Sequence, residues 1–136
     1  TLINVCVDPN HVAENLDALG EVFRAVRDGG RNEDDIILLG NVETDPDHLG
    51  RLAEVPNLVA AVNGSPSTTR GTRLVDNIFF DRRATVEYTG RSGVLDLIRE
   101  LDLTPQVAVT VSEHLPVWAE FSSYENGQSG HVPVTK

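Results

Sequence analysis

Three clusters of polar side chains each follow a run of residues with high strand propensity. They occupy residues 6–8, 41–45 and 112–114, and they include Cys6, Asn41, Glu43, Glu113 and His114. Loop residues beyond the ends of strands commonly converge on ligands in α/β proteins. Imidazole and carboxylate groups can exchange protons, whereas thiol and carboxylate groups can bind metal ions. We therefore expect a functional site where these clusters meet.

The first third of the chain predicts a strand, a helix and a second strand. Residues 2–7 form a short β-prone run that suits a buried strand. Apolar residues then recur at spacings of three and four from Val12 to Val26, ending before Gly29 and Gly30. Residues 36–39 predict a central strand that stops at Gly40.

The remainder predicts shorter elements. We expect a short helix over 45–52, a strand near 58–62, a surface loop over 63–72 and a helix near 95–101. Segments 74–80 and 85–88 flank a polar turn and indicate a hairpin, and the runs 107–111 and 116–121 are β-prone. Together these elements predict an α/β fold, as an α+β layered sandwich with a mixed sheet and helices packed on one face.

Four short motifs in the same order resemble those of a known family. Residues 37–43, Ile-Leu-Leu-Gly-Asn-Val-Glu, resemble a strand ending in Gly-Asp-Phe-Asn, and residues 112–118 resemble the closing Ser-Asp-His-x-Pro-Val signature. Residues 69–72 followed by 75–80 are similar to a strand with a Tyr-Asp-x-Ile pattern, and residues 4–7 sit where the family has Asn-x-His. The chain thus resembles the C-terminal half of the endonuclease/exonuclease/phosphatase family, which has a deoxyribonuclease I-like fold. This family includes nucleases, inositol phosphatases and sphingomyelinases.

The resemblance implies a role for His114, which matches the closing His that contacts the phosphate or serves as acid and base. Asp76 is implied to be structural or to orient that His. Cys6 stands where the family has a His, and a thiol cannot donate a cationic N–H to phosphate. Asn41 replaces the Asp that activates water, and an amide cannot accept a proton at neutral pH.

Two further substitutions concern the metal that the resemblance implies, Mg²⁺ or Mn²⁺. Glu43 replaces an Asn that holds the phosphate, and Glu113 replaces an Asp that orients the His. Glu43 would repel a phosphate unless a metal lies between them, so Glu43 and Glu113 are the candidate metal ligands. For Cys6, a small buried hydrophobe is the alternative interpretation, and for Asn41 and Glu43 it is a turn at the strand end.

The family's metal-binding Glu and an early Asn come from a first half that these 136 residues do not contain. We therefore expect either a missing N-terminal half or a homodimer, because the inner face of the sheet would otherwise be exposed. The implied function is a metal-dependent phosphoesterase or nuclease acting on nucleic-acid or small-molecule phosphate esters, impaired or inactive as this chain alone. The alternatives are a noncatalytic pseudoenzyme that serves as a binding or self-assembling scaffold, and a derivative of an active enzyme.

The composition of the chain disfavours some classes of partner, metal site and location. The 21 acidic and 11 basic residues give a formal charge of -10, which disfavours nonspecific binding to nucleic acid. A single cysteine excludes an intrachain disulfide, and no Cys/His array indicates zinc. No apolar run reaches the roughly 20 residues of a membrane span, so we expect a soluble chain and favour the cytoplasm. We expect one domain over 1–122, a polar tail over 123–136, and surface positions for His11, His48 and His131.

Overall fold

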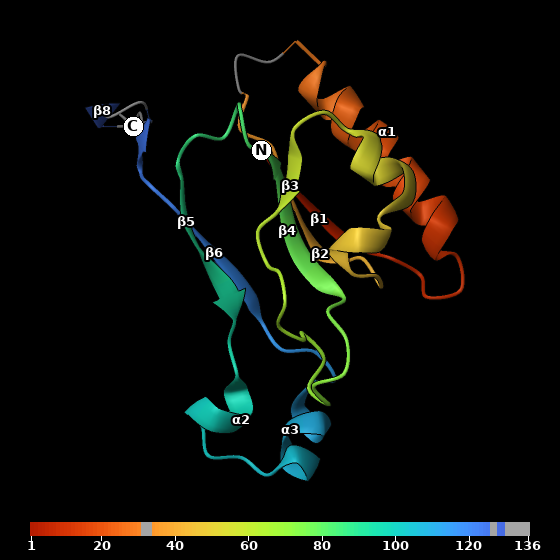
Figure 1. Ribbon diagram of the computed structural model, residues 1–136, viewed down its shortest axis with the longest axis vertical. Helices are drawn as coiled ribbons and strands as arrows, with labels where there is room; N and C mark the ends of the chain where they lie inside the picture. Colours follow the sequence, from red (N-terminus) through yellow and green to blue (C-terminus); the bar gives the residue numbers. More distant parts are fainter. Residues whose placement is uncertain (31–33, 126–127, 130–136) are drawn as a thin grey trace, which may run out of the picture.

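The computed structural model describes residues 1–30, 34–125 and 128–129 (Figure 1). Strands, helices and two 3-10 helices (η) alternate along the chain. In order they are β1 (Leu2–Cys6), α1 (Val12–Arg27), β2 (Ile37–Asn41), η1 (Pro46–His48), η2 (Gly50–Glu54), β3 (Leu58–Ala60), β4 (Asp76–Asp81), β5 (Tyr88–Val94), α2 (Leu97–Glu100), α3 (Pro105–Val111), β6 (Val117–Phe121), β7 (Tyr124–Glu125) and β8 (Gln128–Ser129).

The largest sheet has four strands in the order β1-β2-β4-β3. β1 pairs with β2 in parallel, whereas β4 pairs with both β2 and β3 in antiparallel orientation. The sheet is therefore mixed, as the sequence predicts, and the chain has a mixed α and β architecture. Because β1 and β2 are parallel and β4 runs the other way, the ends of β1 and β2 meet the start of β4 at one edge.

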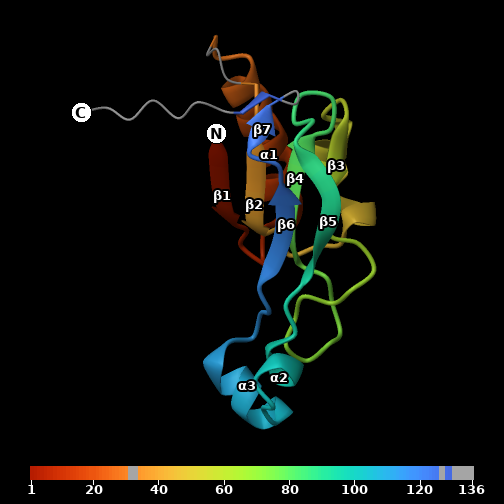
Figure 2. The same ribbon diagram turned by 90° about the vertical axis from the view of Figure 1, so that its left-hand side faces the viewer.

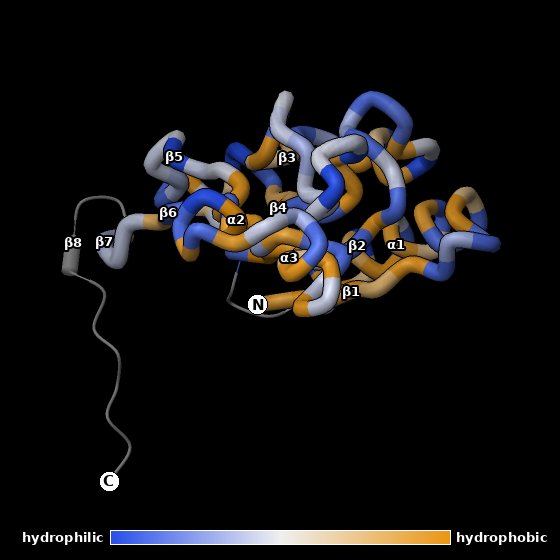
Figure 3. Tube along the Cα trace, turned by 90° about the horizontal axis from the view of Figure 1, so that it is seen from below, coloured by the Kyte–Doolittle hydropathy of each residue, from blue (hydrophilic) through white to orange (hydrophobic). Residues whose placement is uncertain are grey.

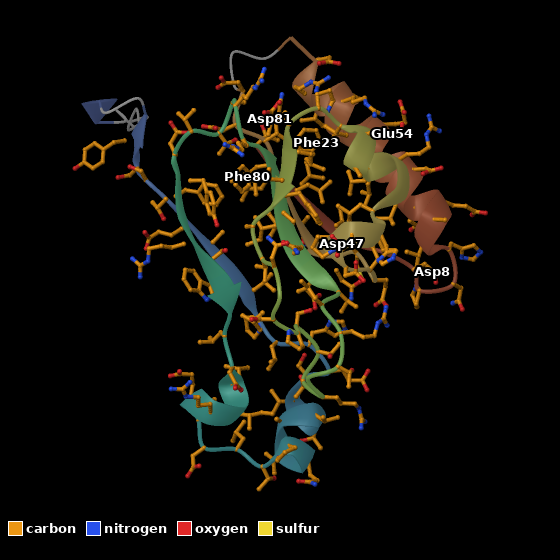
Figure 4. The ribbon with its side chains drawn as sticks, in the orientation of Figure 1. Asp8, Phe23, Asp47, Glu54, Phe80 and Asp81 are labelled. Carbon is orange, nitrogen blue, oxygen red and sulfur yellow. The ribbon has the colours of Figure 1, made fainter. Side chains whose placement is uncertain are left out.

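Helix α1 packs on one face of this sheet. Its apolar spacing places Leu16 and Phe23 inward, where they are almost fully buried with Leu38 of β2 and Phe79 of β4. Figure 4 shows Phe23 on the side of the helix that faces the sheet. Val22, which also has this spacing, is 42% exposed, because the buried stripe of the helix is narrower than the predicted face.

The opposite face of the sheet is covered by β5 and β6, which pair with each other in antiparallel orientation (Figures 1 and 2). Phe80 of β4, Tyr88 of β5 and Phe121 of β6 form an aromatic cluster with ring centroids 4.8 to 5.6 Å apart. The expectation of an exposed inner face is therefore wrong for β4, because the chain covers that strand with its own two-stranded sheet of β5 and β6. On β1 the uncovered face remains, where Leu2 is 71% exposed.

Two predicted elements are corrected. Segment 85–88 does not form a hairpin with β4, since β5 begins at Tyr88 and pairs with β6 instead. Residues 107–111 are helical rather than extended. Thr104 caps α3, accepting a hydrogen bond from Val107 N at 3.3 Å, and Pro105 occupies the first turn, where its missing N–H costs nothing.

Helices α2 and α3 project beyond the end of the sheets (Figure 2). Exposed apolar side chains lie here: Leu101 directly after α2, and Val107 and Val111 on α3. Figure 3 shows hydrophobic residues along α3. Within residues 123–136, β7 pairs with β8, whereas His131 lies outside the described residues. No helix among the described residues is long and apolar enough to cross a membrane.

Candidate functional site

The strand register places three of the predicted site residues in a row across the large sheet. Cys6 is the β1 partner of Asn41, and Asn41 is the β2 partner of Asp76. Neighbouring strands lie about 4.8 Å apart, so the row from Cys6 to Asp76 spans about 10 Å. All three side chains point to the face opposite α1, because they share strand parity with Ile37, Leu39, Ile78 and Phe80 of the inner cluster.

Gly40 is required for this row to form. Its backbone has a φ of +131°, and a Cβ at this position would lie 2.1 Å from the Val5 carbonyl oxygen. Only glycine allows β1 to approach β2 this closely at the end of the strand. In the sequence, Gly40 suggests the end of a strand. In the structure it lies inside β2, one residue before Asn41.

His114 completes the row beside Asp76. Its Nδ1 atom lies 2.8 Å from Asp76 Oδ2, although the two residues are 38 positions apart in sequence. An ionised carboxylate only accepts hydrogen bonds, so Nδ1 carries the proton and Nε2 is left to act on a ligand. The His114 side chain is 39% exposed and that of Asp76 is 13% exposed, which leaves the imidazole accessible above a largely buried carboxylate.

Ser67 holds the Asp76 carboxylate in place through hydrogen bonds. Its hydroxyl donates to Asp76 Oδ2 at 2.7 Å and accepts from the backbone N–H groups of Val75 and Asp76 at 2.9 and 3.0 Å. The serine is fully buried. A buried hydroxyl with three partners fixes the carboxylate in one position, and the carboxylate in turn fixes the imidazole.

The loop that carries Ser67 is joined to the loop that carries His114. Thr68 and His114 form an antiparallel bridge, and Leu115 N donates to Ser67 O. Thr69 donates from its backbone to Glu113 O and from its hydroxyl to Ser112 O. These contacts hold the histidine against the sheet, although it comes from the connection between α3 and β6.

Glu43 lies beside Asn41 and forms a second polar group. Asn41 Nδ2 donates to Glu43 Oε1 at 3.0 Å, and Glu43 N donates to Asn41 Oδ1 at the same distance. Arg73 lies on the other side, with Nη1 3.6 Å from Glu43 Oε2 and Nη2 donating to Glu43 O at 2.6 Å. Glu43 adopts a left-handed backbone with φ of 58°, which these bonds stabilise.

Two interpretations of site residues are corrected. Cys6 is exposed rather than a small buried hydrophobe, because β5 and β6 do not cover the face of β1 on which it lies. The carboxylate against His114 belongs to Asp76 and not to the adjacent Glu113. Glu113 is exposed, and its backbone carbonyl accepts the hydrogen bond from Thr69 N in the joined loops.

Two other histidines form ion pairs in exposed turns outside the row. His11 Nδ1 lies 3.1 Å from Asp8 Oδ2, and His48 Nδ1 lies 2.7 Å from Asp45 Oδ1. The hydrogen bond to Asp45 raises the pKa of His48, and the same bond lowers the pKa of Asp45. Both positions agree with the surface locations expected from the sequence.

Sequence reasoning missed Ser67, Thr69 and Arg73. The loop over 63–72 is predicted to lie on the surface, but Ser67 and Thr69 are buried in it. The one available signal is a run of short hydroxyl residues before a strand, since Ser and Thr satisfy backbone groups in irregular segments. That signal gives no indication that the partner is Asp76.

The donor set does not form a divalent metal site by itself. The two Glu43 oxygens face the Asn41 amide and the Arg73 guanidinium, and Mg²⁺ prefers several free oxygen ligands. Among the residues that the structure describes, no group of three or more His, Cys, Asp or Glu side chains could hold a metal ion. Glu43 and Glu113 therefore do not fit the pair of metal ligands suggested by the sequence.

Comparison with protein-family models finds no match, and comparison with curated proteins finds none either. The geometry alone indicates what the row can do. An accessible imidazole nitrogen, backed by a carboxylate, can donate to an anion when protonated and accept a proton when neutral. Asn41 adds an amide next to Asp76 in the row, and Cys6 adds a thiol at its far end.

Proposed function

We propose that the row from Cys6 to His114 binds a phosphate ester, and that the chain is a phosphoesterase-type domain of the endonuclease/exonuclease/phosphatase family. The observation that carries the proposal is the His114–Asp76 contact of 2.8 Å at the end of the Cys6–Asn41–Asp76 register. Residues from four separate parts of the chain contribute to this row.

In this proposal His114 acts on the phosphate through Nε2. Asp76 accepts from Nδ1–H and orients the imidazole, so that Nε2 faces the ligand and, when it carries a proton, donates to a phosphate oxygen. Ser67 holds the carboxylate in place. Asn41 cannot remove a proton from water, so we expect this chain to bind phosphate esters and to hydrolyse them slowly or not at all.

The Asn41–Glu43–Arg73 group favours a second proposal, a noncatalytic scaffold that keeps the binding site. Glu43 is paired with a cation rather than free to approach a phosphate, so its charge is partly offset. Hydrolysis would then require groups from outside the described residues. A second copy of this chain or a separate N-terminal half is the proposed source, with Mg²⁺ or Mn²⁺ bound by those groups.

Binding is tested by titrating phenyl phosphate into the full chain and following the His114 ring protons by NMR. We expect the His114 signals to shift, and His114→Ala to abolish binding. His48→Ala is the matched control, because His48 also pairs with an aspartate but lies in an exposed turn. Equal binding by the two variants would show that the row is not the site.

Hydrolysis is tested separately with bis(para-nitrophenyl) phosphate and supercoiled DNA in Mg²⁺, Mn²⁺ or EDTA. The comparison is a variant carrying Cys6→His, Asn41→Asp, Glu43→Asn and Glu113→Asp. Turnover by the variant alone would support an intact scaffold with a disabled site. Metal-dependent turnover by the unmodified chain would refute the expectation of little activity. If neither protein hydrolyses substrate, light scattering gives the mass of the chain in solution. A monomer would then favour the explanation that a separate N-terminal half is needed, rather than a dimer.

A further inference from the structure

A cavity of about 520 Å³ lies at the opposite end of β4 from His114. It is bounded by the edge strand β3 and by the segment of residues 82–88 that leads into β5. Asp76 and Arg82 are six residues apart on and just beyond β4, which corresponds to about 20 Å of extended chain. The cavity is therefore separate from the phosphate site proposed above, and the inference does not depend on that proposal.

Aromatic and aliphatic side chains form one part of the cavity wall, and polar groups contribute about as much of its surface. The rings of Phe80 and Tyr88 have centroids 4.8 Å apart and are tilted by 54°, and Val59 and Val86 contribute the aliphatic surface. Figure 4 shows Phe80 on the side of β4 that faces β5. A hollow of this size, with an apolar part beside polar groups, suits a small molecule that carries one flat ring and one polar group.

Two polar groups of the cavity lack partners. Thr85 lines the cavity and is 3% exposed, and its Oγ1 atom has no hydrogen-bond partner in the described part of the chain. Buried hydroxyls are normally satisfied, so this donor indicates a missing acceptor. Arg82 lies on the rim and is exposed, and no carboxylate among the described residues is within ion-pair distance of it.

We propose that this cavity binds a small aromatic carboxylate. The ring packs against the partly exposed side chains of Val59, Val86 and Tyr88. One carboxylate oxygen pairs with Arg82, and the other accepts a hydrogen bond from Thr85. Rotation about the Cα–Cβ bond of Thr85 moves the enclosed hydroxyl to another staggered position, in which it donates to the ligand. A single cation and a single hydroxyl match the single charge and two oxygens of a carboxylate.

The probe is para-fluorobenzoate, titrated against the full chain and followed by fluorine NMR. We expect saturable binding with a Kd on the order of 1 mM, typical of a ligand with so few atoms. The neutral para-fluorobenzamide should bind about tenfold more weakly, because it cannot pair with Arg82. Acetate, which has the charge without the ring, should not displace the probe. Absence of saturable binding, or equal affinity for the amide, would overturn the proposal.

Three variants locate the site. Arg82→Gln should weaken binding about tenfold, whereas Arg83→Gln, an equal change of charge at the next exposed residue, should leave it unchanged. Thr85→Val should weaken binding about fivefold without lowering the melting temperature, because the hydroxyl it removes is unpartnered in the free chain. Equal effects of the two arginine variants would refute the site, as would a clear loss of stability in Thr85→Val.

Discussion

Replacing Ser67 with alanine should destabilise the chain more than any other loss of a single hydroxyl from this loop. The serine oxygen has three partners, the N–H groups of Val75 and Asp76 and the Asp76 carboxylate, and alanine removes all three bonds. Two bonds between neutral groups are worth about 1 kcal/mol each and the bond to a carboxylate about 1.5 kcal/mol. We therefore expect the free energy of unfolding to fall by about 3.5 kcal/mol.

The measurement is urea unfolding at pH 7, followed by circular dichroism, with the slope against urea compared between the two proteins. An unchanged slope shows that the difference in midpoint reports stability alone. Ser65→Ala is the matched control, since Ser65 is exposed two residues earlier in the same loop, and this variant should change stability by less than about 0.5 kcal/mol. A Ser67→Ala loss below about 1 kcal/mol would refute the proposed role of this hydroxyl.

Two further predictions concern the end of β2 and an exposed turn. Gly40→Ala should cost about 4 kcal/mol in urea unfolding, because its Cβ would meet the Val5 carbonyl, whereas Gly64→Ala, with positive φ but open space, should cost about 1 kcal/mol. A similar cost for both would contradict the steric argument. His48→Gln should lower the melting temperature between about pH 4 and pH 7 and leave it unchanged near pH 9. The raised pKa of His48 makes its contribution disappear as pH rises through that pKa, and the lowered pKa of Asp45 makes it disappear as pH falls through that one. An equal difference at all pH values would refute this account.

The first strand, helix and second strand could be predicted because each is defined by its own residues. The apolar spacing of α1 and the short run of β2 need no knowledge of the rest of the chain. β5 could not be predicted in this way. It is a polar strand with exposed residues from Thr89 to Arg91, and its identity depends on pairing with β6 nearly thirty residues later. Strand propensity is a property of that context more than of the segment itself.

The candidate site likewise contains residues that could be predicted from the sequence and residues that could not. Cys6 and Asn41 could be placed at one edge because two successive strands with a helix between them are parallel. Val107, Val109 and Val111 favour a strand by their β-branched side chains, yet the Thr104–Pro105 cap starts a helix there. The strand propensity of these valines was outweighed by the helix-capping signal of Thr104 and Pro105, which was already present in the sequence. Ser67 could not be predicted, since its role depends on long-range contacts.

The contacts of residues 41 and 43 give a physical reason for considering their two substitutions together. The family pattern has a carboxylate followed by an amide, and this chain has an amide followed by a carboxylate. Asn41 Nδ2 donates to Glu43 Oε1, so the exchange retains one donor and one acceptor. Changing only Asn41 to Asp would place two carboxylates 3 Å apart, and changing only Glu43 to Asn would leave Arg73 without its carboxylate. The proposed phosphoesterase activity should therefore be tested with both positions changed together.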